Sequence, residues 1–249
     1  MKTYALIGKK LGHSLSAGMF NSRFADKGVD ARYVLRELAD ISELPEFLDS
    51  CPDIAGFNVT VPYKQGVIPF LDSLSPEARE IGAVNCVKVE RAEGKRRLTG
   101  FNTDVEGFTE MIPPEFRRSP ALALVLGTGG AAKAAAYALR QLGIAVKFVS
   151  RARKPLAETY DGLDPLLVET ADIIVNATPL GMWPDVDSAP PLDYSLICPG
   201  QLCLDCVYNP EDTLFVRLCR ERGATALSGM AMLEGQARGN ARIWNLDIF

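Results

Sequence analysis

The sequence predicts a two-domain α/β fold in which each domain is built on a mostly parallel sheet. Three observations indicate it. The chain has 249 residues, enough for one large domain or two modest ones. Strand-like and helix-like stretches alternate through the first part of the chain and again after residue 104, as in proteins with parallel sheets. A glycine-rich turn follows one buried-type strand and opens a helix.

The composition excludes several functional classes. Hydrophobic residues make up 47% of the chain and charged residues 23%, which is ordinary for a globular protein. The net charge of −4 disfavours nucleic acid or an anionic membrane as a partner, because both require a basic face. We find no signal peptide and no apolar stretch of membrane-spanning length. The six scattered cysteines suggest no disulfide framework, so we expect a cytoplasmic protein.

We expect the first domain to span residues 1–103, joined by a C-terminal helix within 231–249. Its predicted strands are 4–8, 32–38 and 54–60, followed by a hairpin of 83–90 and 98–101. Its predicted helices start at a Ser16 cap, at Ser42, at Pro62 and at Ser75.

The second domain is expected to span residues 104–230. Its predicted strands are 121–126, 145–149, 173–176, 201–207 and 224–227. Its predicted helices are 105–111, 131–142 and 212–222, and a last helix, 231–244, is expected to return to the first domain.

A dinucleotide-binding turn is predicted at residues 127–132, which fit G-x-G-x-x-A between a strand and a helix. Gly127 permits the tight turn, Gly129 lets the backbone approach a pyrophosphate, and Ala132 allows close packing of helix on strand. The free N–H groups of the helix N-terminus would face the phosphates. These features predict a Rossmann-type domain; the alternative is a glycine-rich loop that only packs.

The next strand ends in a basic turn that favours NADP over NAD. An NAD site usually places a carboxylate about 20 residues after the glycines. Here Ser150 is followed by Arg151, Arg153 and Lys154, with no carboxylate among them. Guanidinium groups bind phosphate well, so the turn suits a 2′-phosphate. A solvated basic turn remains the alternative.

Polar residues in the first domain cluster where strands end. Asn58 and Thr60 share one face of a strand by their spacing of two, and Lys64 follows shortly after. Asn85 and Asp104 also stand at strand ends, where open α/β sheets place their sites.

These residues suit the oxidation of an alcohol, in which a cofactor takes the hydride and a protein group must take the proton. The only histidine is His13, and Lys64 beside Asp104 is the candidate pair for that proton. The alternatives are a solvated lysine and an aspartate that caps the helix after it.

Eight segments in the same order resemble the shikimate dehydrogenase family over essentially the whole chain. They are GHSLS at 12–16, NVTVPYK at 58–64, IGAVN at 81–85, GFNTD at 100–104, GTGGAA at 127–132, NATPLGM at 176–182, VYNP at 207–210 and GMAMLEGQ at 229–236. Eight collinear matches are far more specific than any one of them.

The resemblance implies a reversible, NADP-dependent reduction of 3-dehydroshikimate to shikimate, in aromatic amino-acid biosynthesis. It implies that Lys64 transfers the proton with Asp104 as its partner, and that no metal takes part. The residues implied to bind substrate are Ser14, Ser16, Thr60, Asn85, Asp104, Tyr208 and Gln236. Those implied to contact NADP are Gly127, Gly129, Gly130, Ala131, Ser150, Arg151, Arg153, Thr178, Cys206 and Gly229. A monomer or a homodimer is expected.

Other readings stay open. The chain departs from the family pattern at residues 16–21, at Ala152 and at Cys86, the first on the substrate side and the second near the expected 2′-phosphate. Relatives include quinate/shikimate dehydrogenases that prefer NAD and similar enzymes of other cyclic hydroxy acids. A non-catalytic nucleotide or metabolite sensor is the alternative from another class. Cys203 and Cys206 form a C-x-x-C within an apolar strand, so we expect their thiols on opposite faces rather than in a redox or metal pair.

Overall fold

The computed structural model describes residues 1–12, 14–92, 94–117 and 121–249, and its chain divides into two compact units. The first unit consists of Met1–Thr103 and Ala237–Phe249, and the second is Asp104–Gln236. The predicted domain boundaries place the whole last helix with the first domain, whereas the compact units divide within that helix.

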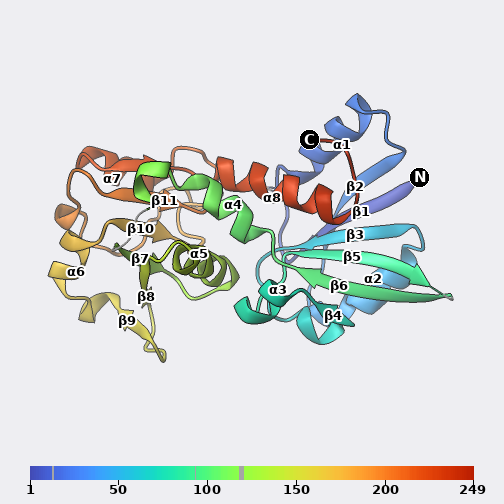
Figure 1. Ribbon diagram of the computed structural model, residues 1–249, viewed down its shortest axis with the longest axis horizontal. Helices are drawn as coiled ribbons and strands as arrows, with labels where there is room; N and C mark the ends of the chain where they lie inside the picture. The colour runs from blue at the N-terminus through green and yellow to red at the C-terminus, as the bar shows by residue number, and fades with distance from the viewer. Residues whose placement is uncertain (13, 93, 118–120) are drawn as a thin grey trace. The chain divides into compact units, whose positions relative to one another are not determined.

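The first unit is built on a six-stranded mixed sheet in the order β2-β1-β3-β5-β6-β4 (Figure 1). β1 pairs in parallel with both β2 and β3, whereas β5 is antiparallel to β3 and to β6. The strands are β1 (Lys2–Gly8), β2 (Ala31–Glu37), β3 (Ile54–Val59), β4 (Ser73–Leu74), β5 (Cys86–Ala92) and β6 (Lys95–Phe101).

Helices cover both faces of this sheet, and alternate side chains of β1 point into the two cores that result. Ala5 and Ile7 join a core with α2 (Leu44–Ser50) and α3 (Pro76–Ile81). Tyr4 and Leu6 join an aromatic-rich core with α1 (Ser16–Asp26) and the C-terminal part of α8 (Met230–Ile243). Short 3₁₀ turns lie at Ile41–Glu43 and Ile68–Phe70.

Trp244 anchors the chain's C-terminal segment onto the first sheet. Its Nε1 donates to the Val87 carbonyl oxygen at 3.0 Å. A Cβ on Gly56 of β3 would lie 2.2 Å from the same Nε1, so this strand position requires glycine.

The second unit is built on a six-stranded, fully parallel sheet in the order β12-β11-β10-β7-β8-β9. Its strands are β7 (Leu122–Leu126), β8 (Ala145–Ser150), β9 (Ala157–Thr159), β10 (Ile173–Asn176), β11 (Leu202–Asp205) and β12 (Thr225–Leu227). This is the doubly wound Rossmann order, with the reversal of strand order between β7 and β10.

Two cores cover the faces of this sheet. Ala123 and Val125 face α4 (Asp104–Met111), α5 (Gly130–Gln141) and the start of α8. Leu124 and Leu126 face α6 (Pro165–Thr170) and α7 (Leu214–Glu221). Further 3₁₀ turns lie at Pro114–Phe116, Tyr160–Gly162 and Tyr194–Leu196. Cys203 belongs to the second core and Cys206 packs against the first, so the C-x-x-C thiols lie on opposite faces, as predicted.

Two predicted helix starts are wrong. No α-helix follows Pro62: residues 61–67 are a series of turns that leads into the 3₁₀ turn Ile68–Phe70, because most of the backbone bonds there span three residues and not four. Ser16 is the first residue of α1 rather than its cap, and its own N–H donates to Ser14 Oγ at 3.2 Å. The Ser75 cap is confirmed, since its hydroxyl accepts from the Ala78 N–H.

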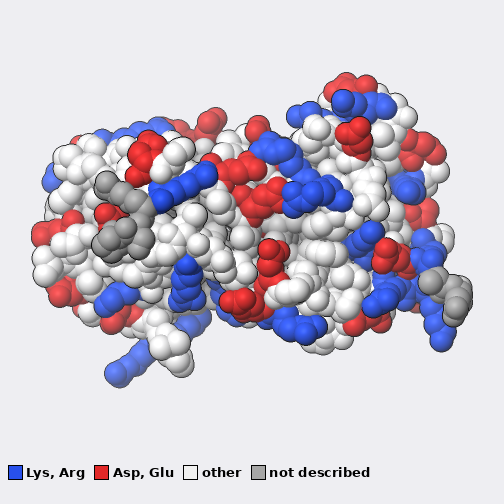
Figure 2. All heavy atoms as spheres, in the orientation of Figure 1, with Lys and Arg blue, Asp and Glu red and all other residues white. Residues whose placement is uncertain are grey.

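On the face of the molecule shown in Figure 2, acidic and basic side chains are interspersed on the surface of each unit. No helix in the described part of the chain combines the length and the apolar character that a bilayer span requires.

Candidate active site

The first unit gathers Thr60, Lys64 and Asn85 at one edge of its sheet, where β1 and β3 end. The Thr60 N–H donates to the Ile7 carbonyl at 2.9 Å, so Thr60 lies beside the end of β1. The Val84 N–H donates to the Lys64 carbonyl at 2.7 Å, which places the lysine backbone next to the residue before Asn85. Lys64 is half-buried. Because β5 runs antiparallel to β3, its start at Cys86 lies at this same edge.

A buried hydrogen-bond frame fixes Asn85. Its Oδ1 accepts from the Thr103 N–H at 2.7 Å, and its Nδ2 donates to Thr103 Oγ1 at 3.0 Å. Asn58 Nδ2 donates to the Asn85 carbonyl, while Tyr33 donates its hydroxyl proton to Asn58 Oδ1 at 2.7 Å. Asn58 therefore holds the backbone of Asn85 in place. Thr60 lies just beyond the end of β3.

Ser14 and Ser16 lie at the start of α1, both half-buried. The Ser14 N–H donates to the Leu11 carbonyl at 2.9 Å. His13 lies outside the described residues.

Asp104, Tyr208 and Gln236 belong to the second unit. Asp104 is the first residue of α4 and is 1% exposed. The sequence offered Asp104 as a possible cap of a helix starting at Val105, whereas the helix begins at Asp104 itself. Tyr208 follows β11 and Gln236 lies on α8, each half-buried.

The glycine-rich turn stands at the point where the strand order of the second sheet reverses. Gly127 has φ +112°, and a Cβ on it would lie 2.9 Å from the Ala177 carbonyl oxygen, so only glycine fits. Gly129 caps α5, and a Cβ on it would meet no heavy atom within 4 Å, so the space above it is open. Gly130 and Ala131 form the first turn of α5, whose N–H groups suit phosphate oxygens.

The basic turn after β8 is tied to the glycine-rich turn. Lys154 Nζ donates to Thr128 Oγ1 at 2.7 Å. Ser150 is buried at the end of β8, and its Oγ accepts from the Ala152 N–H. Arg151 and Arg153 are exposed. Burial raises the pKa of Tyr160 to about 12, while the positive charge of Arg151 acts in the opposite direction.

The loops after β10, β11 and β12 complete this edge of the second sheet. Thr178 donates from both its N–H and its Oγ1 to Asn176 Oδ1, at 3.1 and 2.6 Å. The Cys206 N–H donates to the Asn176 carbonyl, and the Gly229 N–H donates to the Val207 carbonyl, each at 2.9 Å. The predicted cofactor contacts Thr178, Cys206 and Gly229 therefore stand on one connected framework.

Sequence reasoning missed the Lys154–Thr128 bond and the buried Asp205 within that framework. The lysine was visible as a third cation after β8, and Thr128 as the polar member of the glycine-rich turn. Asp205 lies in an apolar strand, where a lone carboxylate is itself a signal.

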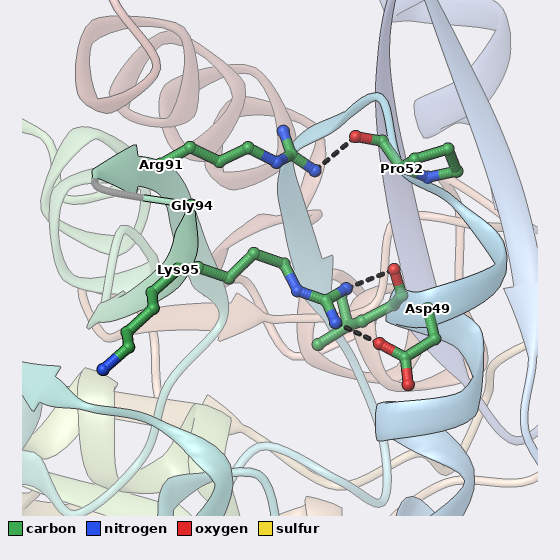
Figure 3. A pocket seen from close by; sticks show the side chains of 7 residues that line it. Asp49, Pro52, Arg91, Gly94 and Lys95 are labelled. Carbon is green, nitrogen blue, oxygen red and sulfur yellow. Dashed lines mark hydrogen bonds and ion pairs between the residues drawn. The ribbon is translucent and has the colours of Figure 1, made fainter.

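Two other polar regions of the first unit are explained by internal bonding. A hollow of about 590 Å³ is lined by Leu48, Asp49, Pro52, Arg91, Gly94, Lys95 and Arg96 (Figure 3). Its two guanidinium groups donate to the carbonyls of Pro52, Ile54 and Leu48 and to the Asp49 carboxylate.

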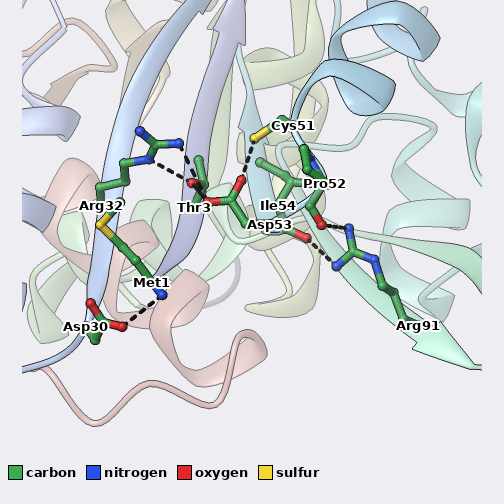
Figure 4. A network of polar contacts seen from close by, with 9 residues as sticks. All are labelled: Met1, Thr3, Asp30, Arg32, Cys51, Pro52, Asp53, Ile54 and Arg91. Carbon is green, nitrogen blue, oxygen red and sulfur yellow. Dashed lines mark hydrogen bonds and ion pairs between the residues drawn. The ribbon is translucent and has the colours of Figure 1, made fainter.

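The second region ties together the amino ends of β1, β2 and β3 (Figure 4). Asp53 accepts from Thr3 Oγ1 at 2.5 Å and from Cys51 Sγ, and it pairs with Arg32. This network lies at the end of the sheet opposite Thr60 and Lys64. Burial, with the adjacent Asp53, raises the pKa of the Cys51 thiol, so the thiol is held protonated. Among the residues that the structure describes, no three His, Cys, Asp or Glu side chains gather as a metal site would require.

A parallel sheet in this strand order, with a glycine turn at its reversal point and a second α/β unit, defines a two-domain protein of the Rossmann type. Residues 6–87 match the family model described as the shikimate dehydrogenase substrate binding domain. The shikimate dehydrogenase (NADP(+)) of Pelodictyon phaeoclathratiforme is 37% identical over 263 residues, covering 98% of this chain and 91% of the relative. The chain belongs to the shikimate dehydrogenase family.

Solved structures agree with that assignment. Shikimate dehydrogenase 1 from Peptoclostridium difficile is 35% identical with a TM-score of 0.85, covering all of this chain and 94% of that one. The shikimate 5-dehydrogenase of Thermus thermophilus, solved in complex with NADP(H) and shikimate, is 33% identical with a TM-score of 0.84. That comparison covers 98% of this chain and 93% of the other.

Proposed function

We propose that this protein is an NADP-dependent dehydrogenase that reversibly reduces 3-dehydroshikimate to shikimate. The observation that carries the proposal is the full-length similarity to enzymes named for this activity, in a chain with a glycine turn at the reversal point of its second sheet. The reaction belongs to aromatic amino-acid biosynthesis. None of the six cysteines is disulfide-bonded, and we propose a reducing, cytoplasmic location.

The second unit offers a fitting cradle for NADP. Gly127 forms the tight turn, Gly129 leaves room for a close approach, and the N-terminus of α5 offers N–H groups to the pyrophosphate. We assign the 2′-phosphate to Arg151 and Arg153, whose guanidinium groups are exposed and free of carboxylate neighbours along the turn. Gly130, Ala131, Ser150, Thr178, Cys206 and Gly229 are the remaining proposed contacts. When bound, NADPH supplies the hydride, and NADP takes it back in the reverse direction.

The residues of the chain then have to bind the ring and handle one proton. In the reduction, the Lys64 ammonium donates a proton to the substrate's carbonyl oxygen, and the amine takes it back when the alcohol is oxidised. Asp104 is proposed to hold the lysine in place. Thr60, Asn85 and Gln236 bind the ring hydroxyls, Ser14 and Ser16 bind the carboxylate, and Tyr208 lines the site.

The direct test is the rate at which the purified protein reduces the cofactor, to NADPH or NADH, with shikimate and with quinate, each with NADP and with NAD. We expect turnover with shikimate and NADP to be the fastest of the four. Fast oxidation of quinate with NAD, and none of shikimate, would instead identify the protein as a quinate dehydrogenase. Cofactor binding without turnover of any cyclic hydroxy acid would support the sensor reading instead.

A further inference from the structure

The carboxyl group of Asp205 is buried at the centre of the framework that carries three of the proposed cofactor contacts. Asp205 is the last residue of β11 and is 0% exposed. Its Oδ1 accepts from Asn176 Nδ2 and from the Val207 N–H, both at 2.9 Å. Its Oδ2 lies 2.6 Å from Thr213 Oγ1, whose hydroxyl caps α7. A carboxyl group in this place is costly to bury, and packing alone does not require it.

The first consequence concerns the amide of Asn176. Its Nδ2 faces two acceptors, Asp205 Oδ1 and the Leu180 carbonyl. Its Oδ1 must therefore face the opposite way, where it receives the N–H and the hydroxyl of Thr178. Asp205 thus sets the orientation of the Asn176 amide, and through that amide it fixes Thr178. A Cβ on Gly127 would lie 3.3 Å from Thr178 Cγ2, so that loop lies against the glycine-rich turn.

The second consequence concerns the end of β11. By accepting from the Val207 N–H, Asp205 holds the chain that bears Cys206 and Tyr208 in a turn. The Val207 carbonyl then receives the Gly229 N–H at 2.9 Å. A Cβ on Gly229 would lie 2.7 Å from the Cys206 carbonyl oxygen, so these two segments are in close contact. The Asp205 side chain therefore bonds to the end of β10 and to the loop after β11, and that loop in turn bonds to the loop after β12.

We propose that Asp205 is a positioning residue for the cofactor: without touching NADP, it holds Thr178, Cys206 and Gly229 in their binding geometry. This inference rests on the proposed function, because it takes these three residues as cofactor contacts. It also predicts how substitutions differ. Asparagine can keep the network, with its Oδ1 accepting from Asn176 and Val207 and its Nδ2 donating to Thr213. Leucine keeps the volume and loses all three bonds.

The test compares the full chain with four variants: Asp205→Leu, Asp205→Asn, Asn176→Val and Asp172→Leu. Asp172 is the matched control, because its carboxylate accepts the Leu122 N–H at 2.8 Å at the opposite, amino ends of β7 and β10. NADP dissociation constants are measured by calorimetry. Hydrogen exchange of the loop 176–182 is measured in the cofactor-free protein, and folding is checked by thermal melting.

We expect Asp205→Leu and Asn176→Val to weaken NADP binding by about tenfold or more. In both, the 176–182 loop should exchange faster before any cofactor is added. Asp205→Asn should keep most of the wild-type affinity for NADP. Asp172→Leu should lower the melting temperature and leave the NADP dissociation constant within about twofold of the wild type.

Wild-type affinity for NADP in a folded Asp205→Leu protein would overturn the inference, as would an equal loss in Asp172→Leu. If Asp205→Leu does not fold, the NADP affinity of Asn176→Val decides: a wild-type value in that folded variant would likewise overturn the inference. Failure of the wild type itself to bind NADP would instead contradict the proposed function, so the two failures are distinguishable.

Discussion

The ionisation of Asp205 links the stability of the second unit to pH. Burial raises the pKa of Asp205 to about 7 from an ordinary value of 3.8, and the bonds from Thr213, Val207 and Asn176 offset only part of that effect. Between these two values the unfolded chain has lost the proton while the folded protein keeps it. Rising pH therefore favours unfolding in this window.

We accordingly expect Asp205→Asn to gain stability relative to the wild type as pH rises from about 4 to 7, by up to roughly 4 kcal/mol. Above pH 7 the difference should be constant, and other titrating groups should cancel between the two proteins. Urea unfolding of both proteins across this pH range measures it. A difference that stays flat or shrinks over the window would contradict the prediction.

Single residues could be predicted from the sequence only where their role is local. Gly127 follows from its position in a turn, since the chain must pass there with a positive φ. The sequence could not show which hydrogen bonds Asn58 and Asn85 make, because their partners lie far along the chain. Tyr33 and Thr103 hold them in place from 25 and 18 residues away. The same holds for Asp205, whose partner Asn176 is 29 residues distant.

Among the connecting elements, the turn from Lys154 to Ala157 holds a leucine in a strained conformation. The Ala157 N–H closes the turn on the Lys154 carbonyl at 3.3 Å, and Leu156 has φ 63°. The leucine is 95% exposed, so its side chain contributes no packing. A left-handed conformation costs a non-glycine residue about 1–2 kcal/mol. Glycine would relieve this strain, and its greater flexibility in the unfolded chain would offset only part of the gain in stability.

Leu156→Gly should therefore raise the free energy of unfolding by roughly 0.5–1 kcal/mol. Leu166 offers the matched control, because it is also exposed but lies within α6, where glycine costs about 1 kcal/mol. Denaturant titrations of both variants give the comparison. A loss of stability in Leu156→Gly would show that the turn is not strained.

The basic turn after β8 is the element that we expect to select the cofactor. Arg151→Asp places a carboxylate where the 2′-phosphate is proposed to bind, so KM for NADP should rise by about tenfold or more while KM for NAD falls. The same change at Arg217, an exposed arginine of α7, should leave both constants within about twofold. If the ratio of KM for NADP to KM for NAD were unchanged in Arg151→Asp, the turn would not contribute to cofactor selection.

Elements with a local cause were predicted well, and those decided by distant packing were not. The strand, glycine turn and helix at 122–141 carry their signals within one stretch of sequence. Pro62 indicated a helix start, yet the segment forms turns in which most backbone bonds span three residues. The Tyr63 hydroxyl also bonds to the Leu38 carbonyl, a partner that no local pattern reveals.

At the scale of the whole molecule, the sequence predicted the α/β class and the Rossmann type of the second sheet, and relatives over the full length agree. It did not predict the strand order, because most pairings, unlike the local hairpin of β5 and β6, join segments that lie far apart along the chain. β1, for example, pairs with both β2 and β3, and β10 pairs with β7 about fifty residues earlier.

The account depends most on one functional coupling, because Lys64 and Asp104 come from different units and are proposed to serve one proton transfer. A double-mutant cycle tests it directly: kcat for shikimate oxidation is measured at saturating NADP in Lys64→Ala, Asp104→Asn and the double variant. Each single change should lower kcat by roughly 10²–10⁴-fold, and the double variant should be little worse than Lys64→Ala. Lys95→Ala, at an exposed lysine of β6, should leave kcat unchanged. Near-wild-type turnover in Lys64→Ala, or losses that multiply fully in the double variant, would contradict the account.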